Sequence, residues 1–233
     1  MNTIIVTNIA QIHQRIELAC QRAGRDPQTI RLVAVSKIKP AEDIEKAYQA
    51  GQKLFGESYV QEFRDKSPLV KEPVQWHFIG GLQSNKVKYL RGKVAMIHSV
   101  DRLSLAQEID RQWGKINQVA DILLQVNVGD EASKSGCSVT EIEQLTRQVA
   151  TLPNLRICGL MCLPPHFDDA EKVRPYFKKL RELSEHLATL QLRNVSMKEL
   201  SMGMSGDFEV AIEEGATLVR IGTAIFGARI KND

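Results

Sequence analysis

Short apolar segments rich in β-branched residues alternate with longer amphipathic segments along most of the chain. The apolar segments predict eight strands, at residues 31–36, 53–56, 75–80, 95–100, 121–128, 155–163, 195–202 and 217–222. The segments between them have apolar positions at helical spacing and predict helices, for example at 40–51, 138–152 and 169–190. Strands that alternate with helices form parallel sheets, because the crossover between two parallel strands needs a dozen or more residues.

Eight such strand and helix units fit a single (β/α)8 barrel, a TIM barrel, that occupies residues 1–233 as one α/β domain. Ile9, Ile12 and Ile16 follow helical spacing and predict an extra N-terminal helix before the first strand. A doubly wound open sheet is the alternative, but its first strand is usually followed by a glycine-rich turn, and "VSKIKP" contains no glycine. No linker rich in proline, glycine or serine divides the chain.

Composition and charge narrow the class of protein. The chain is 43% hydrophobic, and its 31 basic and 28 acidic residues form no long block of either sign, which predicts no nucleic-acid partner. It has no signal-peptide pattern and no run of about 18 apolar residues that would span a membrane. The four cysteines form no CxxC pair, so reduced, buried thiols in a cytoplasmic protein are expected.

Two loops near the C-terminus carry the first chemical signal. In a (β/α)8 barrel the active site lies at the C-terminal ends of the strands, and phosphate is often bound by the loops after strands seven and eight. The loop "SMGMSGD" supplies Ser201 and Ser205 after the seventh strand, and "RIGT" supplies Gly222 and Thr223 after the eighth. Glycine and hydroxyl residues are also ordinary turn and cap residues. Because both loops follow the barrel rule, we favour a phosphate site formed by free N–H groups at two helix starts.

Lys37 and Arg220 are the two unusual charges. Lys37 ends the first strand and shares a strand face with Val33 and Val35, so its amine could enter the barrel mouth and form a Schiff base with a carbonyl. A lysine with a packed stem and a solvated ammonium explains the position equally well. Arg220 interrupts the apolar strand "TLVRIG" and needs an acceptor, either Glu199 or a ligand. An amine, a phosphate site and a cation on one rim match the needs of pyridoxal 5′-phosphate.

Motifs along nearly the whole chain resemble the YggS/PROSC family of pyridoxal phosphate homeostasis proteins. They include "LVAVSKIKP", "FGESYVQE", "WHFIGGLQSNK", "GLMCLPP" and "LSMGMSGDFEVAIEEGATLVRIGTAIFG". The resemblance implies the fold of the N-terminal barrel of alanine racemase, with Lys37 as the Schiff-base lysine and Arg220 at the pyridine nitrogen. It also implies that the phosphate lies among Ser201, Ser205, Gly222 and Thr223, and that Ser58, Met161 and Met202 contact the cofactor. Two positions depart from the family pattern: Ser58 replaces an asparagine and Gly81 a histidine.

The resemblance and the residues together predict a cofactor-binding protein without evident catalytic turnover. Racemisation needs a second acid–base group, and none of the tyrosines, Tyr48, Tyr59, Tyr89 and Tyr176, falls in a predicted strand end of the site. An arginine at the ring nitrogen also weakens carbanion stabilisation. We expect a monomer that buffers pyridoxal phosphate or delivers it to pyridoxal phosphate-dependent apoenzymes, and so maintains vitamin B6 and amino- and keto-acid balance.

Three alternatives remain at this stage. The first is a pyridoxal phosphate-dependent enzyme that acts on amino acids in the manner of a racemase. The second is a class I aldolase, which would use Lys37 without a cofactor. The third, and weakest, is a metal hydrolase with His77, His98 and His166 on the barrel rim, because the strand ends supply few of the carboxylates that such sites need.

Overall fold

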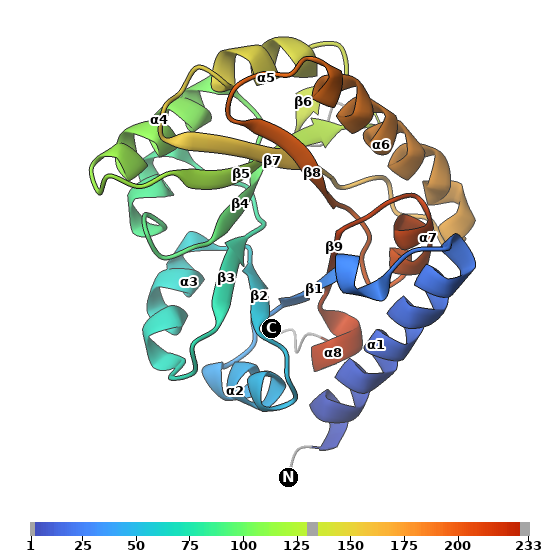
Figure 1. Cartoon of the computed structure of the whole chain (residues 1–233). Helices are drawn as coiled ribbons and strands as arrows, with labels where there is room; N and C mark the ends of the chain where they lie inside the picture. The colour runs from blue at the N-terminus through green and yellow to red at the C-terminus, as the bar shows by residue number, and fades with distance from the viewer. Residues whose placement is uncertain (1–2, 130–134, 229–233) are drawn as a thin grey trace.

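The computed structural model describes residues 3–129 and 135–228, and its centre is a closed barrel of eight parallel strands (Figure 1). The barrel strands are β1 (Arg31–Val35), β2 (Leu54–Glu57), β3 (Gln75–Phe78), β4 (Met96–Val100), β5 (Ala120–Asn127), β7 (Leu155–Cys162), β8 (Val195–Ser201) and β9 (Leu218–Ile221). The β1 strand pairs with both β2 and β9, and a β4–β5 pairing closes the ring. The predicted fold class is confirmed.

Each predicted strand segment contains one barrel strand, and the structure adds β6 (Cys137–Ser138), which pairs with β5 outside the ring. The α-helices surround the barrel: α1 (Thr3–Ala23), α2 (Ala41–Gln49), α3 (Val60–Lys66), α4 (Leu103–Gly114), α5 (Ile142–Val149), α6 (Arg174–Thr189), α7 (Phe208–Glu213) and α8 (Thr223–Phe226). Short 3-10 helices are η1 (Pro27–Thr29), η2 (Ser67–Leu69), η3 (Ser84–Tyr89) and η4 (Ala170–Val173). The crossover from β3 to β4 therefore uses η3 in place of an α-helix.

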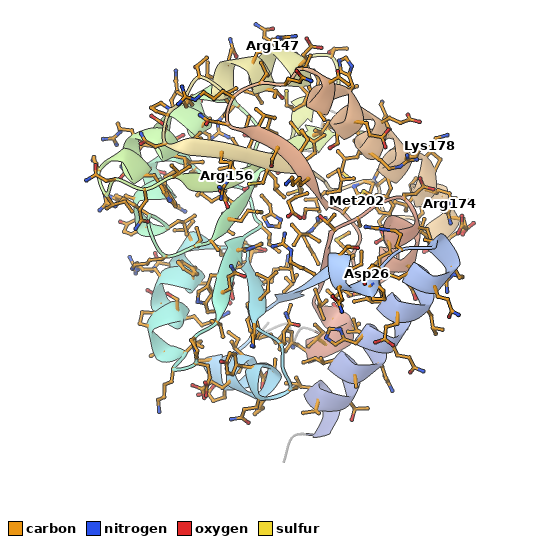
Figure 2. The ribbon with its side chains drawn as sticks, in the orientation of Figure 1. Asp26, Arg147, Arg156, Arg174, Lys178 and Met202 are labelled. Atoms are coloured by element: carbon orange, nitrogen blue, oxygen red, sulfur yellow. The ribbon has the colours of Figure 1, made fainter. Side chains whose placement is uncertain are left out.

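The helices are amphipathic and bury one apolar face against the barrel. In α5, Ile142, Leu145 and Val149 are buried at the spacing that places them on one side of the helix. On the outside of the ring, Figure 2 shows Arg147 and Lys178 pointing away from the strands, while Met202 lies inside the ring of helices. The helix layer therefore separates a charged surface from the main apolar core.

The N-terminal helix α1 covers the two shortest helices of the ring. It lies along α7 and α8 (Figure 1), and Asn8 Nδ2 donates a hydrogen bond to the Ile225 carbonyl at 2.9 Å. Arg15 and Arg22 form exposed ion pairs with Glu209 and Glu213 of α7, each worth no more than about 1 kcal/mol. Because α7 and α8 are short, α1 supplies the apolar surface that shields this side of the barrel.

A second, smaller apolar cluster fills the inside of the barrel. It consists of Val33, Leu54, Met96, Leu123, Cys158, Met161 and Leu218, which come from six different strands. The barrel is therefore a packed core rather than a channel, and a pocket opens beyond the C-terminal ends of its strands. The four cysteines are all buried and unbridged. Among the described residues, no helix combines the length and the apolar character that crossing a membrane requires.

Candidate functional site

A pocket of about 450 Å³ opens at the C-terminal ends of the strands, where the barrel rule predicts the site. The predicted residues that line it are Lys37, Ser58, Ser205, Arg220, Gly222 and Thr223. The other lining residues are Val35, Lys39, Tyr59, Ile79, Gly80, Gly81, Leu163, His166, Phe167, Met204, Gly206, Asp207 and Gly227. The structure thus gathers residues from the ends of β1, β2, β3, β7, β8 and β9 around one space.

Lys37 reaches this pocket because of the alternation of side chains along β1. Val33 points into the apolar cluster inside the barrel, and Val35 and Lys37, two and four residues later, both line the pocket. The strand face predicted for these three residues is therefore the inner one. Lys37 is half-buried and lies in the turn between β1 and α2.

The loops that follow β8 and β9 bring small residues to the wall of the pocket. Gly203 has φ +88°, and a Cβ atom there would lie 2.6 Å from the Ala211 Cβ, so only glycine fits this bend. At Gly222 a Cβ atom would lie 3.2 Å from the Val35 carbonyl oxygen, which shows how closely the start of α8 approaches β1. Ser205 and Thr223 stand beside these glycines and line the same pocket as Lys37, so hydroxyl groups and accessible backbone border the space that Lys37 borders.

Arg220 lies at the bottom of the pocket as a buried cation. Its side chain is 4% exposed, Nη1 donates to Ser201 Oγ at 2.6 Å, and Nη2 donates to the Cys162 carbonyl at 2.9 Å. Both partners are neutral, and within residues 3–129 and 135–228 no carboxylate lies within ion-pair distance of it. Burial lowers the pKa of the guanidinium, and the nearby Asp207 carboxylate partly opposes this effect. A buried cation without a counterion is costly, so the arrangement favours an electron-rich ligand in the pocket.

Glu199 was one of two partners expected for Arg220, and the structure corrects that expectation. Glu199 Oε1 instead forms an ion pair with Arg31, 2.6 Å from Nη2, but the geometry is not that of a hydrogen bond. Glu199 Oε2 accepts a hydrogen bond from Thr217 Oγ1 at 2.6 Å. The reason is the stagger of the strands: Ser201 pairs with Leu218, so Glu199 is displaced by four residues, about 13 Å along the strand, from Arg220. Glu199 therefore lies toward the other end of the barrel.

A chain of buried polar groups continues below Arg220. Ser201 Oγ lies 2.9 Å from His98 Nδ1, and His98 Nε2 lies 2.8 Å from His77 Nδ1. Desolvation lowers the pKa of His77 to about 3 and lowers that of His98 well below its usual value, so both rings are neutral. If Ser201 donates to His98, then His98 donates to His77, and each of these two contacts has one donor and one acceptor.

This burial separates three predicted residues from the pocket. Ser201, Met161 and Met202 are fully buried and do not line it, so none of them faces the space above Arg220. The rim of histidines expected for a metal hydrolase is not formed either: His77 and His98 bind each other inside the barrel, while His166 lies on the pocket wall. Among the described residues no group of histidine, cysteine and acidic side chains is arranged to hold a metal ion.

Comparison with known proteins identifies the family. The model of the alanine racemase N-terminal domain matches residues 7–230. A relative from Aquifex aeolicus, called pyridoxal phosphate homeostasis protein, is 50% identical over 222 residues, which cover 95% of this chain and 96% of that protein. The chain belongs to the pyridoxal phosphate homeostasis protein family.

Two solved structures share this fold over nearly their whole length. PipY of Synechococcus elongatus, solved with pyridoxal phosphate bound, has a TM-score of 0.83 and 33% identity, and the match covers 96% of this chain and 100% of that one. A protein of unknown function from Bifidobacterium adolescentis has a TM-score of 0.91 and 33% identity over 96% of this chain and 95% of that one. The family resemblance stated from the sequence motifs is thus confirmed.

The two departures from the family motifs both lie on the pocket. Ser58 and Gly81 follow β2 and β3, and both are among the lining residues. A Cβ atom at Gly81 would have no neighbour within 4 Å, so the space that a histidine side chain would need is open. Ser58 and Gly81 therefore add little side-chain volume to this part of the pocket wall.

Sequence reasoning missed several residues of the wall. Tyr59, which was expected to lie outside the site, is 52% exposed and lines the pocket just after β2. Asp207 also lines it, and burial raises the pKa of its carboxyl group. His166, which the sequence placed on the barrel rim, lines the pocket as well. These residues lie in loops rather than in strands. Extending each predicted strand end by a few residues, as the barrel rule allows, would have found Tyr59.

Proposed function

We propose that this protein binds pyridoxal 5′-phosphate reversibly in the pocket at the barrel mouth and buffers or delivers it without catalytic turnover. Lys37 is the Schiff-base lysine in this proposal, Ser205, Gly222 and Thr223 hold the phosphate, and Arg220 faces the pyridine nitrogen. Ser201, Met161 and Met202 support the site from below. PipY, which is 33% identical, binds pyridoxal phosphate, and this supports the same ligand here.

The observation that carries the proposal is the position of Arg220 relative to Lys37. A permanent, buried cation and a primary amine line one pocket, together with small and hydroxyl residues. Pyridoxal phosphate supplies an aldehyde for the amine, an acceptor nitrogen for the cation and a dianion for the loops. Arg220 cannot lose its proton under ordinary conditions and so disfavours a second proton beside it, which weakens the ability of the ring to accept electrons.

The direct test is to add pyridoxal phosphate to the protein, reduce with borohydride and locate the adduct by peptide mass analysis. We expect violet absorption before reduction and a pyridoxyl group on Lys37. Lys37→Ala should lose the absorption and keep the fold, because a half-buried lysine in a turn contributes little packing. Lys86→Ala, at an exposed position outside the pocket, is the matched control. An adduct on Lys39 or Lys86 would refute the assignment, and a colourless protein with a reactive Lys37 would favour an aldolase.

Delivery is the second part of the proposal. The loaded protein should transfer pyridoxal phosphate to a pyridoxal phosphate-dependent apoenzyme and restore that enzyme's activity, while a reduced and therefore covalently blocked sample should not. We include a cytoplasmic location and a monomeric state in the same proposal. Light scattering of the loaded and unloaded protein tests the monomer, because either form at twice the expected mass of 26.2 kDa would contradict it.

A second candidate function is a pyridoxal phosphate-dependent enzyme that acts on amino acids. The specific observation in its favour is that Tyr59, His166 and Asp207 line the same pocket and are chemically able to exchange protons. Exchange of the α-proton of amino acids into deuterated water separates the two functions. Stoichiometric or no exchange supports a carrier, whereas repeated turnover that Tyr59→Phe or His166→Gln abolishes would establish an enzyme.

A further inference from the structure

The turn that carries Lys37 lies over a buried group of three charged residues, Glu57, Glu62 and Lys66, which we call the clamp cluster. Glu57 ends β2 and is fully buried, and Lys66 ends α3 and is 8% exposed. Lys66 Nζ donates to Glu57 Oε1 at 2.8 Å and also to Glu62 Oε1. None of the three lines the pocket at the barrel mouth.

The clamp cluster fixes the residue before Lys37 through two hydrogen bonds. Ser36 is fully buried, and its carbonyl oxygen accepts a hydrogen bond from Lys66 Nζ at 2.8 Å. Its hydroxyl donates to Glu57 Oε1 at 2.7 Å. Both the backbone and the side chain of Ser36 are therefore anchored to β2 and α3.

The same cluster fixes the residue after Lys37. The Ile38 N–H donates to Glu62 Oε1 at 2.6 Å, and Ile38 has φ +61°. A β-branched residue rarely adopts this left-handed conformation, which brings its Cβ close to the backbone. Because the Ile38 side chain is 52% exposed, apolar packing gives little compensation for the strain. The surrounding hydrogen bonds hold the strained backbone in place.

The cluster is poorly suited to a purely stabilising role. Burying the Glu57 carboxylate and the Lys66 ammonium is costly, and apolar residues of similar volume would often serve stability as well. Glu57 Oε2 is buried without a hydrogen-bond partner in the part of the chain that the structure describes. A costly buried ionic group and a strained backbone thus occur together on either side of the pocket lysine, and strain of this kind gathers at functional sites.

We propose that the clamp cluster positions Lys37 for its ligand by holding Ser36 and Ile38, the residues on both sides of it. The proposal rests on the assignment of Lys37 as the Schiff-base lysine. Glu57, Glu62 and Lys66 are positioning residues, because they act through the turn and not by contact with the pocket. Release of either neighbour lets the Lys37 amine leave its pocket-facing arrangement, and binding of pyridoxal phosphate then has to order it again.

The sharpest variant is Glu62→Ala, because Glu62 is partly exposed and its removal leaves the Ile38 N–H able to reach water. The matched control is Asp65→Ala, which removes a carboxylate from the same helix. Asp65 accepts hydrogen bonds from Gln61 and Arg64, and neither belongs to the turn. Two quantities are measured for each protein: the Kd of pyridoxal phosphate by absorption titration, and amide hydrogen exchange at residues 37–39 without ligand.

We expect Glu62→Ala to raise the Kd about tenfold and to accelerate exchange at residues 37–39 about tenfold, while Asp65→Ala changes both less than twofold. A second substitution, Ile38→Asn, should recover most of the affinity in the Glu62→Ala background, because asparagine adopts the left-handed conformation more readily than isoleucine. A role in stability alone would not be rescued in this way. The proposal is overturned if Glu62→Ala behaves as Asp65→Ala does, or if Ile38→Asn recovers nothing.

Failure of the proposed function gives a different pattern. If the parent protein forms its borohydride-trapped adduct on a residue other than Lys37, the binding assignment falls. Amide exchange in the unloaded proteins still reports whether the clamp cluster holds the turn. An affinity loss in Glu62→Ala with a normal Lys37 adduct in the parent protein supports both assignments.

Discussion

Two arginines on neighbouring strands, Arg31 of β1 and Arg220 of β9, point into opposite halves of the same barrel. The side chain of Arg31 is 42% exposed and lies 2.6 Å from the Glu199 carboxylate. Arg220 is 4% exposed, and its hydrogen bonds within residues 3–129 and 135–228 go to a hydroxyl and a carbonyl. Solvation and burial alone would give the opposite arrangement, because the buried cation has the greater need of a counterion.

The difference between the two arginines shows that the protein's own side chains fill the N-terminal end of the barrel and leave a pocket at the C-terminal end. At the N-terminal ends of the strands, the Glu199 carboxylate lies beside Arg31 and accepts a hydrogen bond from Thr217, and the apolar cluster around Val33 closes the interior above them. At the C-terminal ends, Arg220 and Lys37 line a pocket, and among the described residues no carboxylate lies within ion-pair distance of Arg220. Arg220 is the more deeply buried of the two arginines, and in the described part of the chain it has no charged partner within ion-pair distance. A binding site for an anionic ligand that carries an aldehyde is the simplest explanation.

The largest predicted effect is a loss of stability in acid, which arises from the buried pair His77 and His98. The pKa of His77 is lowered to about 3, below its unfolded value of about 6.5, so its contribution to stability is full above pH 6.5 and is lost as the pH falls toward 3. Each buried histidine lowers the free energy of unfolding by up to about 1.4 kcal/mol per pH unit in this range. Denaturant titrations at pH 7, 6 and 5 measure the slope.

The control for this prediction is His13→Gln, at an exposed position of α1, which should keep the parent slope. His77→Gln should flatten it between pH 6.5 and 5, because one of the two depressed groups is gone. Burial raises the pKa values of Glu57 and Asp207, so these carboxyl groups act in the opposite direction, and the difference between variants is the decisive quantity. Equal slopes in all three proteins would mean that the histidine pair is not buried as described.

Replacing Arg31 or Arg220 by methionine tests directly whether the two arginines have different roles. We expect Arg220→Met to weaken pyridoxal phosphate binding about a hundredfold, or about 3 kcal/mol, because the ligand loses the buried guanidinium at the bottom of the pocket. The unloaded protein should become more stable by about 1 kcal/mol, since an unpaired buried charge has been replaced by an apolar side chain. Arg31→Met should do the reverse: it should lower stability by about 1 kcal/mol and leave the Kd unchanged.

Absorption titration and chemical denaturation of these two variants measure both effects. Arg31→Met also serves as the control for loss of a positive charge inside the barrel. An Arg220→Met protein that binds the ligand normally and unfolds more readily than its parent would show that Arg220 is a structural residue.

The strand pattern predicted most of this arrangement, and its limits have physical causes. Alternation along β1 was enough to place Val33, Val35 and Lys37 on the inner face. The failed pairing of Glu199 with Arg220 depends on the stagger between β8 and β9, which hydrogen-bond register sets and which side-chain pattern does not reveal. The sequence also does not reveal how deeply a side chain is buried. Ser201 lies at a strand end, yet it is fully buried beneath Arg220.

Loops were the other limit. Tyr59 and Asp207 belong to turns, where no periodicity indicates the direction of a side chain. The clamp cluster combines the end of β2 with one face of α3, and its hydrogen bonds to Ser36 and Ile38 join residues 21 to 30 positions apart, which only the folded chain brings together. Sequence therefore predicted the barrel and the residue types at its mouth. The structure was needed to distinguish the residues that line the pocket from those that support it from below.

Gly203→Ala tests how tightly the loop after β8 is built. The added methyl group would lie 2.6 Å from the Ala211 Cβ, at a φ of +88° that alanine disfavours. We expect a loss of about 2 kcal/mol in stability together with weaker ligand binding, because the loop that carries Ser205 has to shift. Gly206→Ala is the control, since a Cβ there meets no atom within 4 Å. Equal thermal midpoints for the two variants would show that the loop is not constrained at Gly203.

Gly81→His should have the smallest effect on the fold, and it tests whether the ligand lies against this part of the pocket wall. A Cβ atom at Gly81 has no neighbour within 4 Å and its φ is not in the left-handed region, so we expect stability to change by less than about 0.5 kcal/mol. The imidazole would then extend over a pocket wall that Ser58 and Gly81 leave wide. Ligand release should slow by a small factor, about twofold to fivefold in the dissociation rate, if the ligand lies on this side. Stopped-flow transfer to an apoenzyme measures that rate, and an unchanged rate in a folded variant would place the ligand entirely on the side of Gly222 and Thr223.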